Sequence, residues 1–219
     1  LVLIRNKQFH RWSINNQLEN NMSFRKEKKF KLSNSEISEV KKNFFKKGMT
    51  QLYTSRLINS IYFDNKELCL FKDSEEGVVP RKKIRIRWYE NEKKFSKEVK
   101  ISSLEGRYKY REPFNLKNLF NDFTNLNIFD QQYGNLKPLI SVKYNREYYS
   151  LKNLRITFDK NISYCDLQHK SNTCYYDKMC VMEIKAPSDY SDDYIEKIFN
   201  HPTSRFSKYC RGLLQLRRF

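Results

Sequence analysis

Charged and apolar side chains alternate along several short stretches of this chain, with the two-residue period of a β-strand. In residues 81–89 the sequence RKKIRIRWY places four cations on one face and apolar side chains on the other. The same alternation recurs at residues 27–32, 98–101, 107–111, 154–159 and 181–185. The pattern predicts a mostly antiparallel sheet whose strands each have one charged and one apolar face.

Three other stretches carry the helical period. A capping box opens residues 33–48, and apolar side chains follow it at helical spacing. A second helix is expected at residues 116–123, after a cap at Asn115. A third begins near Ser191 and stops before Pro202. Together with the strands, these helices predict an α+β fold that is mostly antiparallel β.

The chain reads as one domain. Residues 1–22 are polar and rich in Asn, so we expect an N-terminal extension outside the fold, with residues 23–219 forming the domain. No run reaches the roughly 18 to 20 apolar residues that span a bilayer, so no membrane segment is expected. The five cysteines are odd in number and contain no C-x-x-C pair. We therefore expect reduced thiols, no zinc site and a cytoplasmic location.

The net charge of the chain indicates the kind of partner that it binds. The chain has 43 Lys and Arg against 25 Asp and Glu, a net charge of +18, and a pI near 9.6. Such a balance favours an anionic partner: nucleic acid, anionic lipid or a small polyphosphate. The alternative is a basic surface that serves solubility only. Charge alone does not choose among these.

The density of cations on single strand faces argues for a bound anion. Same-face neighbours on a strand lie about 7 Å apart. Each like-charged pair then repels by about 2 kcal/mol at a dielectric constant near 20, and by about 0.6 kcal/mol in water. An ordinary sheet with one wet face does not require four cations in a row, as in residues 81–87. A dense anion placed against them would make the arrangement favourable.

Closure of the sheet into a barrel would bring the cations of several strands close together. A barrel of roughly eight strands leaves room for one slender ligand, and charged faces pointing inward would make a cationic tunnel covered outside by helices. Glu27, Glu98 and Glu183 would lie among the cations. Some would form neutralising pairs, and one or two could hold Mg²⁺ or Mn²⁺ through oxygen ligands. Cations and a metal around phosphates are what phosphoryl transfer needs.

Seven short motifs in order carry a family resemblance: RKKIRIRWY, EVK, KYR, VKYNREYY, LRITFD, VMEIKAP and FSKYCRG. From about residue 24 to 212 the chain resembles the polyphosphate polymerase domain of the vacuolar transporter chaperone complex and its bacterial relatives. That domain lies within the triphosphate tunnel metalloenzyme, or CYTH-like, superfamily. The resemblance implies a closed antiparallel barrel that binds triphosphate or polyphosphate. It further implies transfer of the terminal phosphate of ATP onto a growing inorganic chain, with Mn²⁺ or Mg²⁺.

The resemblance also assigns residues. It implies a phosphate-handling set and a metal site, and we add three lining residues that the family pattern supports less directly. The catalytic cations are Arg85, Arg87, Lys100, Arg146 and Arg155; the other phosphate contacts are Lys29, Ser207 and Lys208; the metal ligands are Glu183 and Glu27; and the added residues are Lys109, Arg111 and Lys185. Three nearby tyrosines are expected to serve packing rather than base stacking: Tyr144, Tyr148 and Tyr149.

One departure bears on the reaction. Hydrolytic members of the superfamily carry a Glu-x-Glu-x-Lys strand, whereas this chain reads Glu27-x-Lys29-x-Lys31. The substitution favours a polymerase over a triphosphatase. A hydrolase and a non-catalytic polyanion binder both stay open. The expected partners are ATP and inorganic polyphosphate or triphosphate, with no nucleic acid, and the oligomeric state is left open.

Overall fold

The computed structural model describes residues 25–115, 123–168 and 173–217. The expected N-terminal extension and most of the helix expected at residues 116–123 lie outside these ranges. Within the described residues, no helix is both long and apolar enough to cross a membrane.

An antiparallel sheet dominates the fold, as the alternating strands predict. Its main path runs in the order β1-β10-β8-β7-β2-β3-β4-β5, while β6 pairs with β7 and β9 pairs with β8. The strands are β1 Arg25–Leu32, β2 Thr50–Asp64, β3 Arg81–Tyr89, β4 Glu92–Ser102, β5 Arg107–Phe114, β6 Ile128–Asp130, β7 Gly134–Leu151, β8 Leu154–Asp166, β9 Cys174–Tyr176 and β10 Cys180–Pro187.

Four described helices accompany the sheet: α1 Asn34–Lys46, α2 Cys69–Glu76, α3 Asp192–Ile198 and α4 Lys208–Arg217. The capping box predicted at the start of α1 is present, with the Ser33 side chain accepting a hydrogen bond from the backbone of Glu36. Ser191 likewise caps α3. Helices α2 and α4 were not predicted; the N-cap of α2, Leu68, makes no side-chain hydrogen bond, so α2 lacks the capping signal that marks α1.

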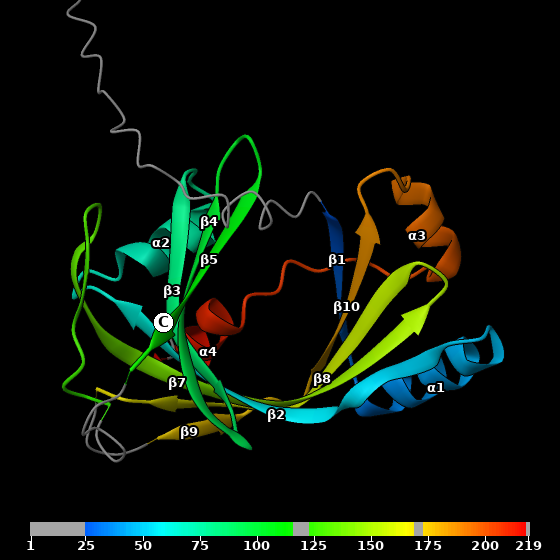
Figure 1. Ribbon diagram of the computed structural model, residues 1–219, viewed down its shortest axis with the longest axis horizontal. Helices are drawn as coiled ribbons and strands as arrows, with labels where there is room; N and C mark the ends of the chain where they lie inside the picture. Colours follow the sequence, from blue (N-terminus) through cyan, green and yellow to red (C-terminus); the bar gives the residue numbers. More distant parts are fainter. Residues whose placement is uncertain (1–24, 116–122, 169–172, 218–219) are drawn as a thin grey trace, which may run out of the picture.

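The sheet curls strongly but does not close by backbone pairing. In Figure 1, β3, β4 and β5 stand on one side, β1, β10 and β8 on the other, and β2 and β7 join them along the bottom. The described residues show no ladder between the edge strands β1 and β5. The expected closed barrel is therefore corrected to a curled half-barrel of eight strands.

The chain between α3 and α4, residues 199–207, forms a strap that contacts the edge strand β1. The backbone N–H of Ser204 donates to the carbonyl of Lys29 at 2.8 Å. Across the seam, Arg107 of β5 reaches Glu27 of β1 at 4.0 Å. Among the described residues, a side-chain contact rather than strand pairing therefore links the two edges.

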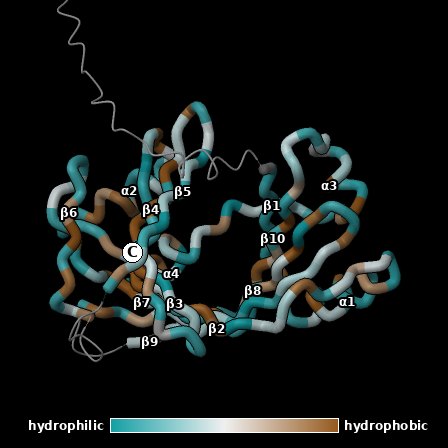
Figure 2. Tube along the Cα trace, viewed as in Figure 1, coloured by the Kyte–Doolittle hydropathy of each residue, from teal (hydrophilic) through white to brown (hydrophobic). Residues whose placement is uncertain are grey.

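Two apolar clusters hold the half-barrel in shape. One packs the apolar faces of β1, β8 and β10 against α1 and α3, with Phe30, Phe158 and Phe44 among its buried members. The other packs β2, β3, β7 and β8 against α2 and α4. Figure 2 shows hydrophobic stretches in both halves. Each fully buried Phe, Leu or Ile contributes about 1.5–3 kcal/mol, so the apolar faces are fixed outward and the charged faces inward.

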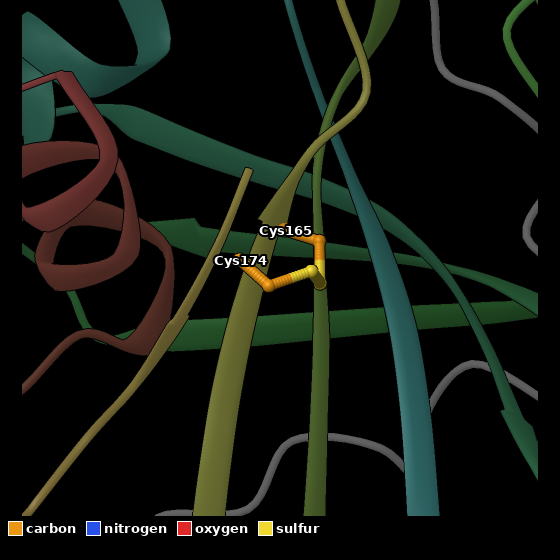
Figure 3. Close-up of a disulfide and its surroundings, with 2 residues drawn as sticks. All are labelled: Cys165 and Cys174. Atoms are coloured by element: carbon orange, nitrogen blue, oxygen red, sulfur yellow. A yellow bond between two sulfur atoms is a disulfide. The ribbon is translucent and has the colours of Figure 1, made fainter. Parts of the chain in front are cut away.

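One disulfide contradicts the expectation of reduced thiols. Cys165 of β8 lies directly opposite Cys174 of β9, with the two Cα atoms 4.1 Å apart, and their sulfurs are bonded (Figure 3). The pairing of β8 with β9 creates this contact between residues nine positions apart. Cys69, Cys180 and Cys210 are free thiols. The cytoplasmic location stays a prediction.

Candidate functional site

The register of the sheet gathers the predicted residues on one face, because side chains directly opposite on paired strands point the same way. We call this concave charged face the channel. Its members are Glu27, Lys29, Glu183, Lys185, Arg155, Asp159, Arg146, Lys83, Arg85, Arg87, Glu98, Lys100, Lys109 and Arg111, joined by Ser207 and Lys208 at the start of α4.

Charges from opposite sides of the curled sheet meet across this face. The ammonium group of Lys100 on β4 interacts electrostatically with Glu183 on β10 and with Lys29 on β1. In the sheet order, four strands lie between β4 and β10. The interaction therefore arises from the curvature of the sheet, which brings the two sides of the channel toward each other.

Glu98 organises the side of the channel formed by β3, β4 and β5. Arg85 donates from Nε and Nη2 to one of its oxygens, at 2.8 Å and 2.5 Å, and Lys109 reaches the other at 2.8 Å. The carboxylate is only 2% exposed. Burial alone would raise the pKa of Glu98, but Arg85, Arg87 and Lys109 outweigh burial and hold this pKa well below its usual range.

Asp159 organises the opposite side. Arg146 donates to both carboxylate oxygens, at 2.5 Å and 2.6 Å, and Lys208 of α4 donates to one of them. The carboxylate is 1% exposed. Burial would raise the pKa of Asp159, yet the charges of Arg146 and Lys208 hold it below its usual value. We did not predict Asp159 as a site residue. Its only signal in the sequence was its place on the charged face of residues 154–159.

Two further carboxylates face each other across β1 and β10. Lys29 lies 3.1 Å from Glu27 and 3.9 Å from Glu183, and Lys185 lies 3.7 Å and 3.1 Å from the same two residues. Burial and the charge of Glu183 favour protonation of Glu27, but Lys29, Lys185 and Lys100 outweigh them. The pKa of Glu27 is therefore lowered.

The resemblance implies a divalent metal at these two carboxylates. The described residues contain no group of three or more Asp, Glu, His or Cys side chains that could hold one alone. Glu27 and Glu183 still fit Mg²⁺ or Mn²⁺, because Mg²⁺ is usually held by one or two carboxylates together with water and substrate phosphates.

Two lysines of the channel have a pKa below the ordinary lysine value. The pKa of Lys100 lies well below its usual range, first because of desolvation in the enclosed channel and then because Arg85 and Arg87 repel its charge; its side chain nevertheless stays accessible from the channel. Desolvation also lowers the pKa of Lys83, whose Nζ donates to Ser207 Oγ at 3.0 Å. Lys83 was not predicted as a site residue, although it shares a strand face with Arg85.

Tyrosine hydroxyls hold the two arginines of β3. Arg87 donates to the Tyr144 hydroxyl at 2.9 Å, and Arg85 donates to the Tyr62 hydroxyl at 2.8 Å. The Tyr144 ring also lies under Arg146, at 5.3 Å from the centroid. Tyr144, Tyr148 and Tyr149 are all buried, as a packing role requires.

Arg155 and Arg111 lie toward the open parts of the channel. Both residues are exposed; Arg155 lies over the Tyr148 ring at 5.7 Å, and Arg111 donates to Ser96 Oγ at 3.1 Å. Neither belongs to the buried groups around Glu98 and Asp159. The remaining predicted cations lie within those groups or beside Glu183.

Comparison with known proteins supports both the fold and the family. A family model described as the VTC domain matches residues 24–217. A candidate adenylate cyclase from Bacillus halodurans is 13% identical, covers 83% of this chain and 92% of its own, and has a TM-score of 0.55. A protein from Pyrococcus horikoshii is 16% identical, covers 88% and 98%, and has a TM-score of 0.51. At these identities the two structures show the fold alone. No curated protein matches the chain.

Proposed function

The chain belongs to the VTC domain family, and from this premise we propose that it is a metal-dependent phosphotransferase. It would move the terminal phosphate of ATP onto an inorganic polyphosphate chain lying in the channel. The observation that carries the proposal is the convergence of cations from seven strands and α4 on one concave face. Such a face suits a dense linear anion far better than a compact one.

The buried carboxylates support catalysis as well as binding. Glu98 and Asp159 hold Arg85 and Arg146 in place before any ligand arrives. Preorganised cations stabilise the charge that spreads over the transferred phosphoryl group without further rearrangement. Guanidinium groups also match the paired oxygens of a phosphate.

In the proposed reaction, an oxygen at the end of the polyphosphate chain attacks the γ-phosphorus of ATP. The bond from that phosphorus to the β–γ bridging oxygen breaks, and ADP leaves with the bonding electrons. Arg87 and Arg146 would bind the transferred group, and Lys83 and Lys100 would bind the neighbouring phosphates. Mg²⁺ or Mn²⁺ at Glu27 and Glu183 would neutralise charge on adjacent phosphate oxygens.

A triphosphatase is the second candidate, and one observation favours it. Glu27 and Glu183 share two lysines on neighbouring strands, so a carboxylate pair is available beside the channel. Against it, Lys29 replaces the second carboxylate of the hydrolytic motif on β1. One fewer acidic group leaves less capacity to hold a metal and direct a water molecule.

Incubation of the purified chain with ATP and Mn²⁺, followed by gel analysis of products, tests the proposal. Phosphate chains longer than three units are expected. Orthophosphate without polymer would favour the hydrolase instead. Tight polyphosphate binding with neither product would leave a non-catalytic binder. Lys100→Ala should lose polymer formation. Lys97→Ala removes a lysine of the same strand that pairs with Glu112 outside the channel, and it should retain formation.

A further inference from the structure

Ser207 marks the point where the strap enters α4. The strap runs from α3 on one side of the half-barrel to α4 on the other (Figure 1). The Ser207 hydroxyl accepts a hydrogen bond from the ammonium group of Lys83 on β3 at 3.0 Å, and another from the backbone N–H of Cys210 at 3.3 Å. The second bond is that of a helix N-cap, and it holds the hydroxyl beside Lys83.

Cations from separate elements approach the chain at Ser207. The carbonyl of the preceding residue, Phe206, accepts a hydrogen bond from Lys29 of β1 at 3.3 Å. The following residue, Lys208, donates to Asp159 of β8. A phosphate group on the Ser207 hydroxyl would carry a charge of about −1.5 to −2. It would lie among these cations and at the N-terminus of α4, where the helix dipole also favours an anion.

The Lys83 amine is placed to take a proton from Ser207. Desolvation lowers the pKa of Lys83, and the neighbouring Cys210 and Tyr62 oppose this only in part. The neutral amine is therefore more populated than that of an ordinary lysine. A neutral amine within hydrogen-bond distance of a hydroxyl can act as its general base, as in catalytic Ser-Lys pairs. The titratable and charged groups that face Lys83 are Cys210, Tyr62, Lys29, Arg81 and, opposite it in the β3–β4 register, Lys100.

From these observations we propose that Ser207 accepts the first phosphoryl group and is the primer to which the polyphosphate chain is attached. Ser207 Oγ attacks the γ-phosphorus of ATP while the neutral Lys83 amine takes the hydroxyl proton. The bond from that phosphorus to the β–γ bridging oxygen breaks, and ADP leaves with the bonding electrons. Lys83 is then a cation beside the new phosphoserine. A phosphoserine oxygen attacks the next ATP in the same way, so the chain grows from the protein.

The inference rests on the proposed function and adds the acceptor that starts a chain. Incubation of the full chain with ATP and Mn²⁺, without added polyphosphate, tests it. After denaturation, mass spectrometry of proteolytic peptides should find phosphate on Ser207. Polymer should stay attached to the denatured protein on a gel, and alkali, which eliminates phosphoserine, should release it. Ser207→Ala should lose the attached phosphate. Ser204→Ala is the matched control and should keep it, because Ser204 lies in the same strap and its hydroxyl has no hydrogen-bond partner among the described residues.

Lys83→Arg tests the proton acceptor. The guanidinium keeps the positive charge but stays protonated, so phosphorylation of Ser207 should slow by about a hundredfold, the lower end of general-base catalysis. The wild-type rate should rise with pH, with a midpoint below the pKa of an ordinary lysine, and the variant should lack this rise. Lys82→Arg is the matched control, because Lys82 is the neighbouring lysine of β3 and pairs with Asp130 at 2.9 Å. It should keep the wild-type rate and pH profile.

The possible outcomes separate the primer from the proposed function. Polymer that is not attached to Ser207 would overturn the primer while leaving the proposed function standing. Phosphate on Ser207 without any longer polymer would support the covalent step and contradict the polymerase. Absence of both products would contradict the primer and the proposed function together. An unchanged rate in Lys83→Arg would exclude Lys83 as the base.

Discussion

The carboxylate of Asp159 accepts two hydrogen bonds from the guanidinium of Arg146, at 2.5 Å and 2.6 Å, across the pair of strands β7 and β8. Lys208, from the last described helix, donates to the same carboxylate. Asp159 therefore supplies, in the free protein, the negative charge that a phosphate would supply in a complex. The Arg146 and Lys208 side chains are therefore held in position before a ligand binds.

Replacing Asp159 with Asn should destabilise the free protein by about 3 kcal/mol, because Arg146 and Lys208 would then share a buried site without a counter-charge. Tripolyphosphate should restore part of the lost stability, because its negative charge replaces that of the Asp159 carboxylate. Urea unfolding with and without the ligand measures both effects. Glu196→Gln, which breaks an exposed pair with Lys28, should cost less than about 1 kcal/mol. A similarly small destabilisation by Asp159→Asn would mean that the Asp159 carboxylate does not stabilise Arg146 and Lys208 in the free protein.

Arg87→Ala should weaken tripolyphosphate binding by at least about tenfold. Arg87 donates to the Tyr144 and Ser60 hydroxyls and reaches Glu98 only at 3.7 Å. Its positive charge is therefore neutralised less by Glu98 than the charge of Arg85 is. A charge-assisted contact to phosphate would account for the loss. Calorimetry gives the affinity directly. Unchanged binding would exclude Arg87 from the site.

Binding of a polyanion should increase the protonation of the Lys100 amine. In the free protein its pKa is depressed by desolvation and by Arg85 and Arg87, so its neutral form is populated at a lower pH than that of an ordinary lysine. An adjacent anion favours the charged form and raises this pKa, and protons are taken up. Titration calorimetry in buffers of different ionisation enthalpy measures the uptake. Lys100→Gln should reduce it, whereas equal uptake in the variant would assign the protons to another group.

The disulfide predicts three reactive thiols in the unreduced, denatured chain and five after reduction. Reduction should lower the free energy of unfolding by about 2–3 kcal/mol, the loop-closure contribution of a bridge spanning nine residues. Thiol titration and urea unfolding check the two numbers. Five thiols before reduction would mean that Cys165 and Cys174 are not bonded.

Local pattern predicted the strands well, and it predicted the charged face with them. Residues 81–89, identified from alternation alone, are β3. The capping box at Ser33 is present as predicted. Both signals lie within a few consecutive residues, so neither depends on how distant parts of the chain meet.

The missed contacts depend on how separate strands and helices meet. Lys83 meets Ser207 across 124 positions, and Asp159 meets Lys208 across 49. Cys165 and Cys174 become neighbours only when β8 pairs with β9. The open seam between β1 and β5 and the hydrogen bond from Ser204 to Lys29 also depend on how separate segments meet, and no local pattern in these segments indicates them. Alternation specifies which side chains share a face but not which of them will touch.

The missing ladder between β1 and β5 has a consequence for a long substrate. A closed barrel, in which backbone hydrogen bonds join every pair of neighbouring strands, can be entered by a polymer only through its ends. Here the contact between Arg107 and Glu27 links the described edge strands. For the polyphosphate substrate proposed above, separation of Arg107 from Glu27 would permit binding from the side of the channel, so internal phosphates of the polymer could bind as well as terminal ones.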